Sequence, residues 1–165
     1  MLIDGYNLLR AVQNFSDDPI TITDVQLCLV LGEYLSRVRK KGKIVFDGTG
    51  PRDKTVFKNI NNLDVLFSGS SREADDIIEE LVLENTAPKR LTVISSDRRV
   101  KAAAKKRKAT AVGSIDFWEE VIKQLEKKRR KPEPREKFSG ISKFETELWL
   151  KEFGLSKGAD HGSKD

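Results

Sequence analysis

The chain has 165 residues, of which 38% are hydrophobic and 35% charged, and its formal net charge at pH 7 is +5. This length suits one globular domain with a tail, so two full domains are not expected. No apolar run approaches the ~20 residues that span a bilayer, and the opening residues do not resemble a secretion signal. We therefore expect a cytoplasmic protein with no membrane partner, in which the single cysteine, Cys28, is a buried apolar side chain.

The positive charge is concentrated in one part of the chain. Residues 98–131 carry thirteen Lys and Arg residues against four acidic ones, whereas the remainder is net acidic. A basic face of this kind favours a polyanionic ligand, because Lys and Arg that neutralise phosphates release condensed counterions. The alternative is an ordinary solvated surface, since runs of charge are common on exposed helices.

The first part of the chain predicts two strands separated by helices. Residues 2–3 are expected to form a short buried strand, followed by a turn in which Asn7 caps the next helix. Residues 14–21 are expected to form a loop. Apolar residues at helical spacing predict a helix over 23–40, and a strand over 43–46 follows it.

The middle of the chain continues the alternation after a loop over 50–62 that holds one short helix. We expect further strands at 64–67, 91–94 and 110–112, and further helices at 74–82, 97–108 and 114–124. Strands that alternate with helices predict an α/β fold, here a three-layer sandwich whose mostly parallel central sheet is covered on both faces.

Three segments are expected along the chain. Residues 1–126 form the folded domain, residues 127–140 form a basic linker that contains prolines, and residues 141–165 form a short amphipathic helix with a polar tail. The aromatic side chains of this last segment either pack back on the domain or anchor a partner.

Acidic residues follow the predicted strands, at the edge of a parallel sheet where ligands bind. Asp4, Asp47 and Asp97 each come after a strand with at most two residues between. A fourth acidic group, residues 73–76, opens the helix after the third strand. Singly, each has an ordinary alternative as a helix cap or turn residue. Together they would repel one another unless a cation compensates them, which favours Mg²⁺ or Mn²⁺.

Helical geometry separates the two aspartates of the fourth group. At 100° per residue, Asp75 borders the apolar stripe of its helix, whereas Asp76 points away from it. Asp75 is therefore the better metal ligand, with Asp76 in an outer position or solvated. A carboxylate cluster holding divalent ions can activate water and stabilise both the attacking and the leaving oxygen in phosphodiester cleavage. The pattern predicts nuclease chemistry.

Four short motifs resemble the YacP-like branch of the NYN domains, over residues 1 to about 125. They are Asp4-Gly5-Tyr6-Asn7, Phe46-Asp47-Gly48, Phe67-Ser68-Gly69 leading into Glu73-Ala74-Asp75-Asp76, and Ser95-Ser96-Asp97-Arg98. NYN domains belong with the PIN-like and flap-nuclease folds, whose acidic residues hold catalytic Mg²⁺ or Mn²⁺ and whose substrates in this branch are mainly RNA.

The resemblance implies roles for individual residues. Asp4, Asp75 and Asp97 would be the catalytic and metal-binding carboxylates, with Asp76 as an additional ligand. The site would be supported by three further residues, namely Asn7, Asp47 and Ser96. Flap nucleases usually carry a second Asp two residues after the one matching Asp97, but Arg99 stands there, which disfavours a flap-type DNA enzyme.

The resemblance also implies a substrate and partners. We expect a metal-dependent ribonuclease, in particular an endoribonuclease, acting on single-stranded or structured RNA. RNA would contact basic residues near the site, namely Arg98, Arg99, Lys101, Lys105, Lys106 and Arg107. YacP-like proteins include ribosome-associated endoribonucleases, so a ribosome is a further candidate partner. The alternative is a non-catalytic RNA- or ribosome-binding module on a PIN-like fold.

Overall fold

The computed structural model describes residues 1–15 and 22–127, which form an α/β sandwich around a five-stranded parallel sheet. The strand order is β3-β2-β1-β4-β5, so the strand that comes first in the chain is central. The strands are β1 (Leu2–Asp4), β2 (Gly42–Phe46), β3 (Leu63–Phe67), β4 (Thr92–Ile94) and β5 (Thr110–Val112). The predicted α/β class and parallel sheet are confirmed.

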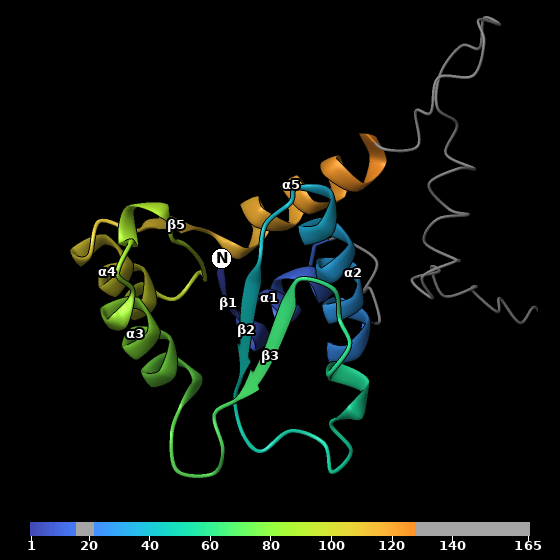
Figure 1. Ribbon diagram of the computed structural model, residues 1–165, viewed down its shortest axis with the longest axis horizontal. Helices are drawn as coiled ribbons and strands as arrows, with labels where there is room; N and C mark the ends of the chain where they lie inside the picture. Colours follow the sequence, from blue (N-terminus) through green and yellow to red (C-terminus); the bar gives the residue numbers. More distant parts are fainter. Residues whose placement is uncertain (16–21, 128–165) are drawn as a thin grey trace, which may run out of the picture.

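Helices cover the sheet on both faces (Figure 1). One face carries α1 (Gly5–Gln13), α2 (Asp24–Arg37) and α5 (Ser114–Lys127), and the other carries α3 (Ala74–Glu84) and α4 (Arg98–Lys106). Two 3-10 helices, η1 (Thr55–Phe57) and η2 (Pro88–Arg90), lie in connections. None of the helices in the two described ranges is long and apolar enough to cross a membrane.

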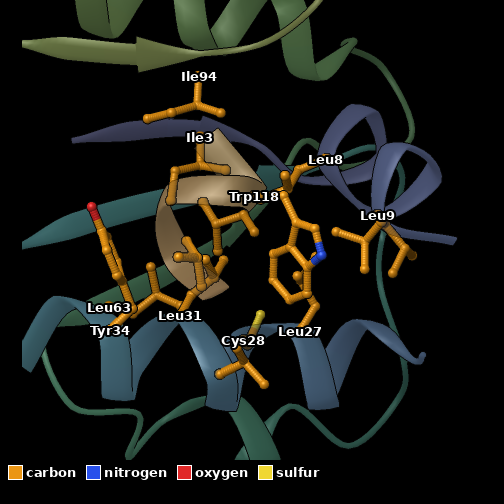
Figure 2. Close-up of a cluster of buried hydrophobic side chains, with 14 of the residues drawn as sticks. Ile3, Leu8, Leu9, Leu27, Cys28, Leu31, Tyr34, Leu63, Ile94 and Trp118 are labelled. Atoms are coloured by element: carbon orange, nitrogen blue, oxygen red, sulfur yellow. The ribbon is translucent and has the colours of Figure 1, made fainter. Parts of the chain in front are cut away.

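Alternation along the strands builds two apolar cores. Ile3 of β1 belongs to the core under α1, α2 and α5, whereas its neighbour Leu2 belongs to the core under α3 and α4. Successive side chains of a strand point to opposite faces, so a strand covered on both sides must be apolar throughout. Figure 2 shows the larger core, in which Trp118 and Cys28 pack with strand residues. Cys28 is fully buried, as predicted.

The structure corrects the start of the first helix. Asn7 does not cap it: α1 already begins at Gly5, and Asp4 is the N-cap residue. The helix predicted over 23–40 ends earlier, at Arg37, and α5 continues to Lys127. Most of the linker predicted for 127–140 and the whole segment 141–165 lie outside the described residues, so those two expectations stay predictions.

Gly5 allows α1 to leave β1 without a connecting loop. A Cβ atom added at Gly5 would lie 2.4 Å from Cδ1 of Phe46, which is fully buried in β2. Real Cβ atoms do not approach a ring so closely, and a buried ring in a packed core has little room to withdraw. The absence of a side chain at Gly5 therefore fixes how closely Asp4 and α1 lie against β2.

We expect Gly5→Ala to destabilise the fold by about 1–3 kcal/mol through overpacking against Phe46. Urea unfolding measures the change. A double-mutant cycle with Phe46→Leu tests the cause, because the smaller side chain should remove part of the clash. Additive effects of the two substitutions would contradict this explanation.

Candidate active site

Asp4 is a buried carboxylate at the carboxyl end of the central strand. Only 6% of its surface is exposed. Its Oδ1 accepts a hydrogen bond from the Asn7 backbone N–H at 3.2 Å, and its Oδ2 accepts one from the Ser95 hydroxyl at 2.9 Å. Burial raises the pKa of Asp4 because it disfavours the charged form, and these two hydrogen bonds oppose that effect.

Asp97 lies next to Asp4 on the neighbouring strand end. It is the N-cap residue of α4, where its Oδ1 accepts from the Arg99 N–H at 2.7 Å. Its own backbone N–H donates to the Ser95 hydroxyl oxygen at 3.0 Å. One serine thus connects the two aspartates, since its hydroxyl donates to Asp4 and accepts from Asp97.

Asn7 ties the ends of β1, β4 and β5 together. Its side-chain oxygen accepts from the Ser96 N–H at 2.8 Å and from the Ser114 hydroxyl at 2.6 Å. The Ser114 N–H in turn donates to the Ser96 hydroxyl oxygen at 3.1 Å. Asn7 and Ser96 therefore join the loops that follow β4 and β5, and the supporting role expected of them in a metal site stays a prediction.

Asp75 faces the other carboxylates from the first turn of α3. Its pKa is raised to about 6, chiefly by burial and then by the negative charges of Asp4 and Asp97. Asp47 adds to the increase, whereas the positive charge of Arg99 opposes it. The structure thus brings Asp4, Asp75 and Asp97 into electrostatic contact, together with Asp47.

Asp47 positions the helix that carries Asp75. Its Oδ1 accepts a hydrogen bond from the Ala74 N–H at 2.6 Å, across 27 positions of sequence. Ala74 is the first residue of α3, so Asp47 satisfies a backbone donor that the helix itself leaves free. This contact holds the first residue of α3 against Asp47, whose supporting role in a metal site stays a prediction.

Asp76 and Arg99 form an acidic and basic cluster beside the site. The Arg99 guanidinium contacts Asp76 at 2.6 Å, Glu79 at 2.6 Å and Glu73 at 3.8 Å. The hydrogen bond from Arg99 lowers the pKa of Asp76. The role of Asp76 as an additional metal ligand stays a prediction, and so does the role of Arg99 as an RNA contact. Either role would require this ion pair to open.

The other predicted RNA-binding residues lie along α4. Lys106 and Arg107 line a hollow of about 390 Å³ between α3 and α4. Arg107 also donates to the Asn85 carbonyl oxygen at 3.2 Å. Arg98 and Lys105 are exposed and Lys101 is partly exposed.

The donor atoms around Asp4 suit a hard divalent cation. They are carboxylate, amide and hydroxyl oxygens, the ligand types that Mg²⁺ and Mn²⁺ prefer. Within residues 1–15 and 22–127, however, no three His, Cys, Asp or Glu side chains are arranged to hold one metal ion. The carboxylates are therefore close enough to repel one another but do not form a ready three-ligand site.

Comparison with protein families identifies the group to which the chain belongs. The model of the YacP-like NYN domain matches residues 1–152. The chain belongs to the YacP-like NYN family. This family is a group of PIN-like nuclease domains, and the match extends beyond the 1–126 domain expected from the sequence.

Solved structures show the same fold. The YacP-like chain is similar to the crystal structure of Rae1 (YacP) from Bacillus subtilis, with a TM-score of 0.62 and 24% identity, covering 78% of this chain and 76% of that one. A tryptophan-to-leucine variant of Rae1 gives a TM-score of 0.60 and 23% identity, covering 78% of each chain. No curated protein matches the chain.

Sequence reasoning missed the two buried serines, Ser95 and Ser114. Ser95 stands in one of the four motifs, but no role was predicted for it. Ser114 is the first residue of a helix far along the chain. Their partners, Asp4 and Asn7, lie 91 and 107 positions away. The one available signal was a polar residue directly after a buried strand, which applies to Ser95.

We expect Asp75→Asn to stabilise the protein at pH 8 without divalent ions, by on the order of 1 kcal/mol after solvent screening. The raised pKa means that Asp75 favours folding below its unfolded pKa and loses this contribution as pH rises through about 6. Thermal unfolding in a chelator, compared at pH 8 and pH 4, measures the difference, which should nearly vanish at pH 4.

Asp76→Asn is the matched control, since its pKa shifts the opposite way. It should lower the melting temperature at pH 8, and the loss should fade as pH falls through the low folded pKa. Equal behaviour of the two variants would contradict the proposed surroundings of Asp75.

Proposed function

We propose that this protein is a divalent-metal-dependent ribonuclease that hydrolyses RNA phosphodiester bonds, as an endoribonuclease, at Asp4, Asp75 and Asp97. The observation that carries the proposal is the convergence of these aspartates from β1, α3 and the end of β4: the pKa of Asp75 is raised to about 6, first by burial and then by the negative charges of Asp4 and Asp97. A protein does not gather like charges in this way without a cost. Membership of a nuclease family supports the same conclusion.

A bound Mg²⁺ or Mn²⁺ ion would offset this repulsion, activate water and stabilise the charge that develops on the phosphodiester oxygens. The residues of this chain supply the fixed framework. Ser95 holds the Asp4 carboxylate, and Asp47 holds the start of α3 and hence Asp75. Asn7 fixes the loops that carry Ser96 and Ser114. Rigid support of this kind keeps catalytic carboxylates in place without reorganisation.

We expect the purified protein to cleave RNA with Mg²⁺ or Mn²⁺, and both Asp4→Asn and Asp75→Asn to lower the rate at least about 100-fold. A labelled RNA closed into a circle distinguishes endonucleolytic cleavage, since it offers no end to an exonuclease. Asp64→Asn is the matched control, because Asp64 is an exposed aspartate on β3 at the amino end of the sheet. Full activity in Asp4→Asn would refute the site assignment.

We also expect millimolar Mn²⁺ to raise the melting temperature of the protein at pH 8. Binding at 100 times the dissociation constant adds about 2.7 kcal/mol to the stability of the folded state. Asp75→Asn should reduce the increase, whereas Asp64→Asn should keep it. An unchanged increase in Asp75→Asn would place the ion elsewhere.

A second candidate is a non-catalytic RNA- or ribosome-binding module. It is favoured by the finding that the described residues contain no group of three side chains ready to hold a metal ion. Salt-sensitive RNA binding without cleavage under either metal would select this function. The cleavage and melting experiments therefore distinguish the two candidates.

A further inference from the structure

The helix α4 presents its basic residues in two separate rows. Val100 and Ala104 are fully buried against the sheet and α3. At 100° per residue, Arg99 and Lys106 lie on one flank of this buried stripe. The remaining basic residues of the helix lie on the other flank of the stripe, and we call them the outer row. These outer residues are Arg98, Lys101 and Lys105.

The row formed by Arg99 and Lys106 faces acidic residues of α3. Arg99 contacts three carboxylates, those of Glu73, Asp76 and Glu79. Lys106 lines the hollow between the two helices, which Asp76, Glu79 and Glu80 also line. Arg99 is therefore paired with α3 within the fold, and Lys106 lies beside the same acidic residues.

The outer row forms no ion pairs with the other described residues. Asp116 is an acidic neighbour of Lys101 near Gly113, but the two do not pair. The row spans about 10 Å along the helix, at 1.5 Å per residue. The row starts at Arg98, directly after Asp97, which is one of the four carboxylates of the candidate site.

We propose that Arg98, Lys101 and Lys105 form a docking track for the phosphodiester backbone of a single-stranded RNA substrate. The inference rests on the proposed ribonuclease function. It assigns RNA binding to these three residues, whereas Arg99 is paired with α3. Charge complementarity carries it: three cations without an ion pair in the described residues lie along one flank of α4, beside the four carboxylates of Asp4, Asp47, Asp75 and Asp97. A strand held along the track is attracted by α4 and delivered to a centre that would otherwise repel it.

Arg98→Ser/Lys105→Ser tests the track in the full-length protein. Fluorescence anisotropy with a labelled single-stranded RNA, in a chelator, measures binding without cleavage. We expect about a tenfold loss of affinity or more, and a decrease of about 1.4 in the slope of log affinity against log salt concentration. The charge-conserving Arg98→Lys/Lys105→Arg should restore most of the binding.

Lys40→Ser/Lys41→Ser is the matched control. It removes the same charge from exposed positions before β2, at the opposite edge of the sheet. Its affinity should stay within about twofold of the wild type, because only screened long-range effects remain. Equal losses in the two double variants would show that net charge alone matters and would overturn the track. An acidic peptide that competes as well as RNA would also overturn it.

The outcome separates the track from the proposed function. Asp4→Asn should keep RNA binding while it loses cleavage, because Asp4 is not part of the track. If no condition gives cleavage but the outer-row variant still loses binding selectively, the function fails and the track stands. If RNA is cleaved but the outer-row variant binds like the wild type, the track fails alone. Melting temperatures of all variants confirm that they fold.

Discussion

Burial of the Asp4 carboxylate is the constraint on which the rest of the site depends. A charge with 6% of its surface exposed needs hydrogen-bond donors, because desolvation of an ion is costly. Asn7 provides one through its backbone, and Ser95 provides the other through its hydroxyl. These partners belong to α1 and to the end of β4, so satisfying one carboxylate fixes the two neighbouring strand ends relative to each other. The backbone N–H of Asp97 donates to the same serine hydroxyl, so the fold itself holds the two aspartates close together.

The repulsion between neighbouring carboxylates is compensated on one side of the site but not on the other. Beside α4, Arg99 compensates Asp76, Glu79 and Glu73 with one guanidinium. Among the described residues no Lys or Arg forms an ion pair with Asp4 or Asp75, and burial together with the neighbouring carboxylates raises the pKa of Asp75 to about 6. Asp75 and Asp76 are adjacent in sequence but lie in opposite electrostatic environments, because one helical step of 100° turns them to different neighbours. This difference explains why the pKa of Asp75 is raised whereas that of Asp76 is lowered.

Much of this arrangement follows from local patterns in the sequence. Buried apolar runs and their spacing predict the five strands, and a parallel sheet brings Asp4, Asp47 and Asp97 to one edge. The stripe on α3 favours Asp75 over Asp76. The predicted start of α1 was wrong because Asp and Asn cap helices about equally well, and in the structure Asp4 caps the helix by accepting a hydrogen bond from the Asn7 backbone N–H. The partners of Ser95, Ser114 and Arg99 could not be predicted, since they depend on contacts between distant segments.

The central place of β1 has a consequence for how the chain folds. Ile3 pairs with Ile44 on one side and with Ile94 on the other. During synthesis the first strand therefore emerges long before its second neighbour, and it must remain half paired until β4 has left the exit tunnel. Contacts between distant segments require costly loop closure and slow the folding of parallel sheets. Until that closure, β1 leaves the backbone N–H and C=O groups of one edge unpaired, and such edges are the sites where a partly folded sheet aggregates.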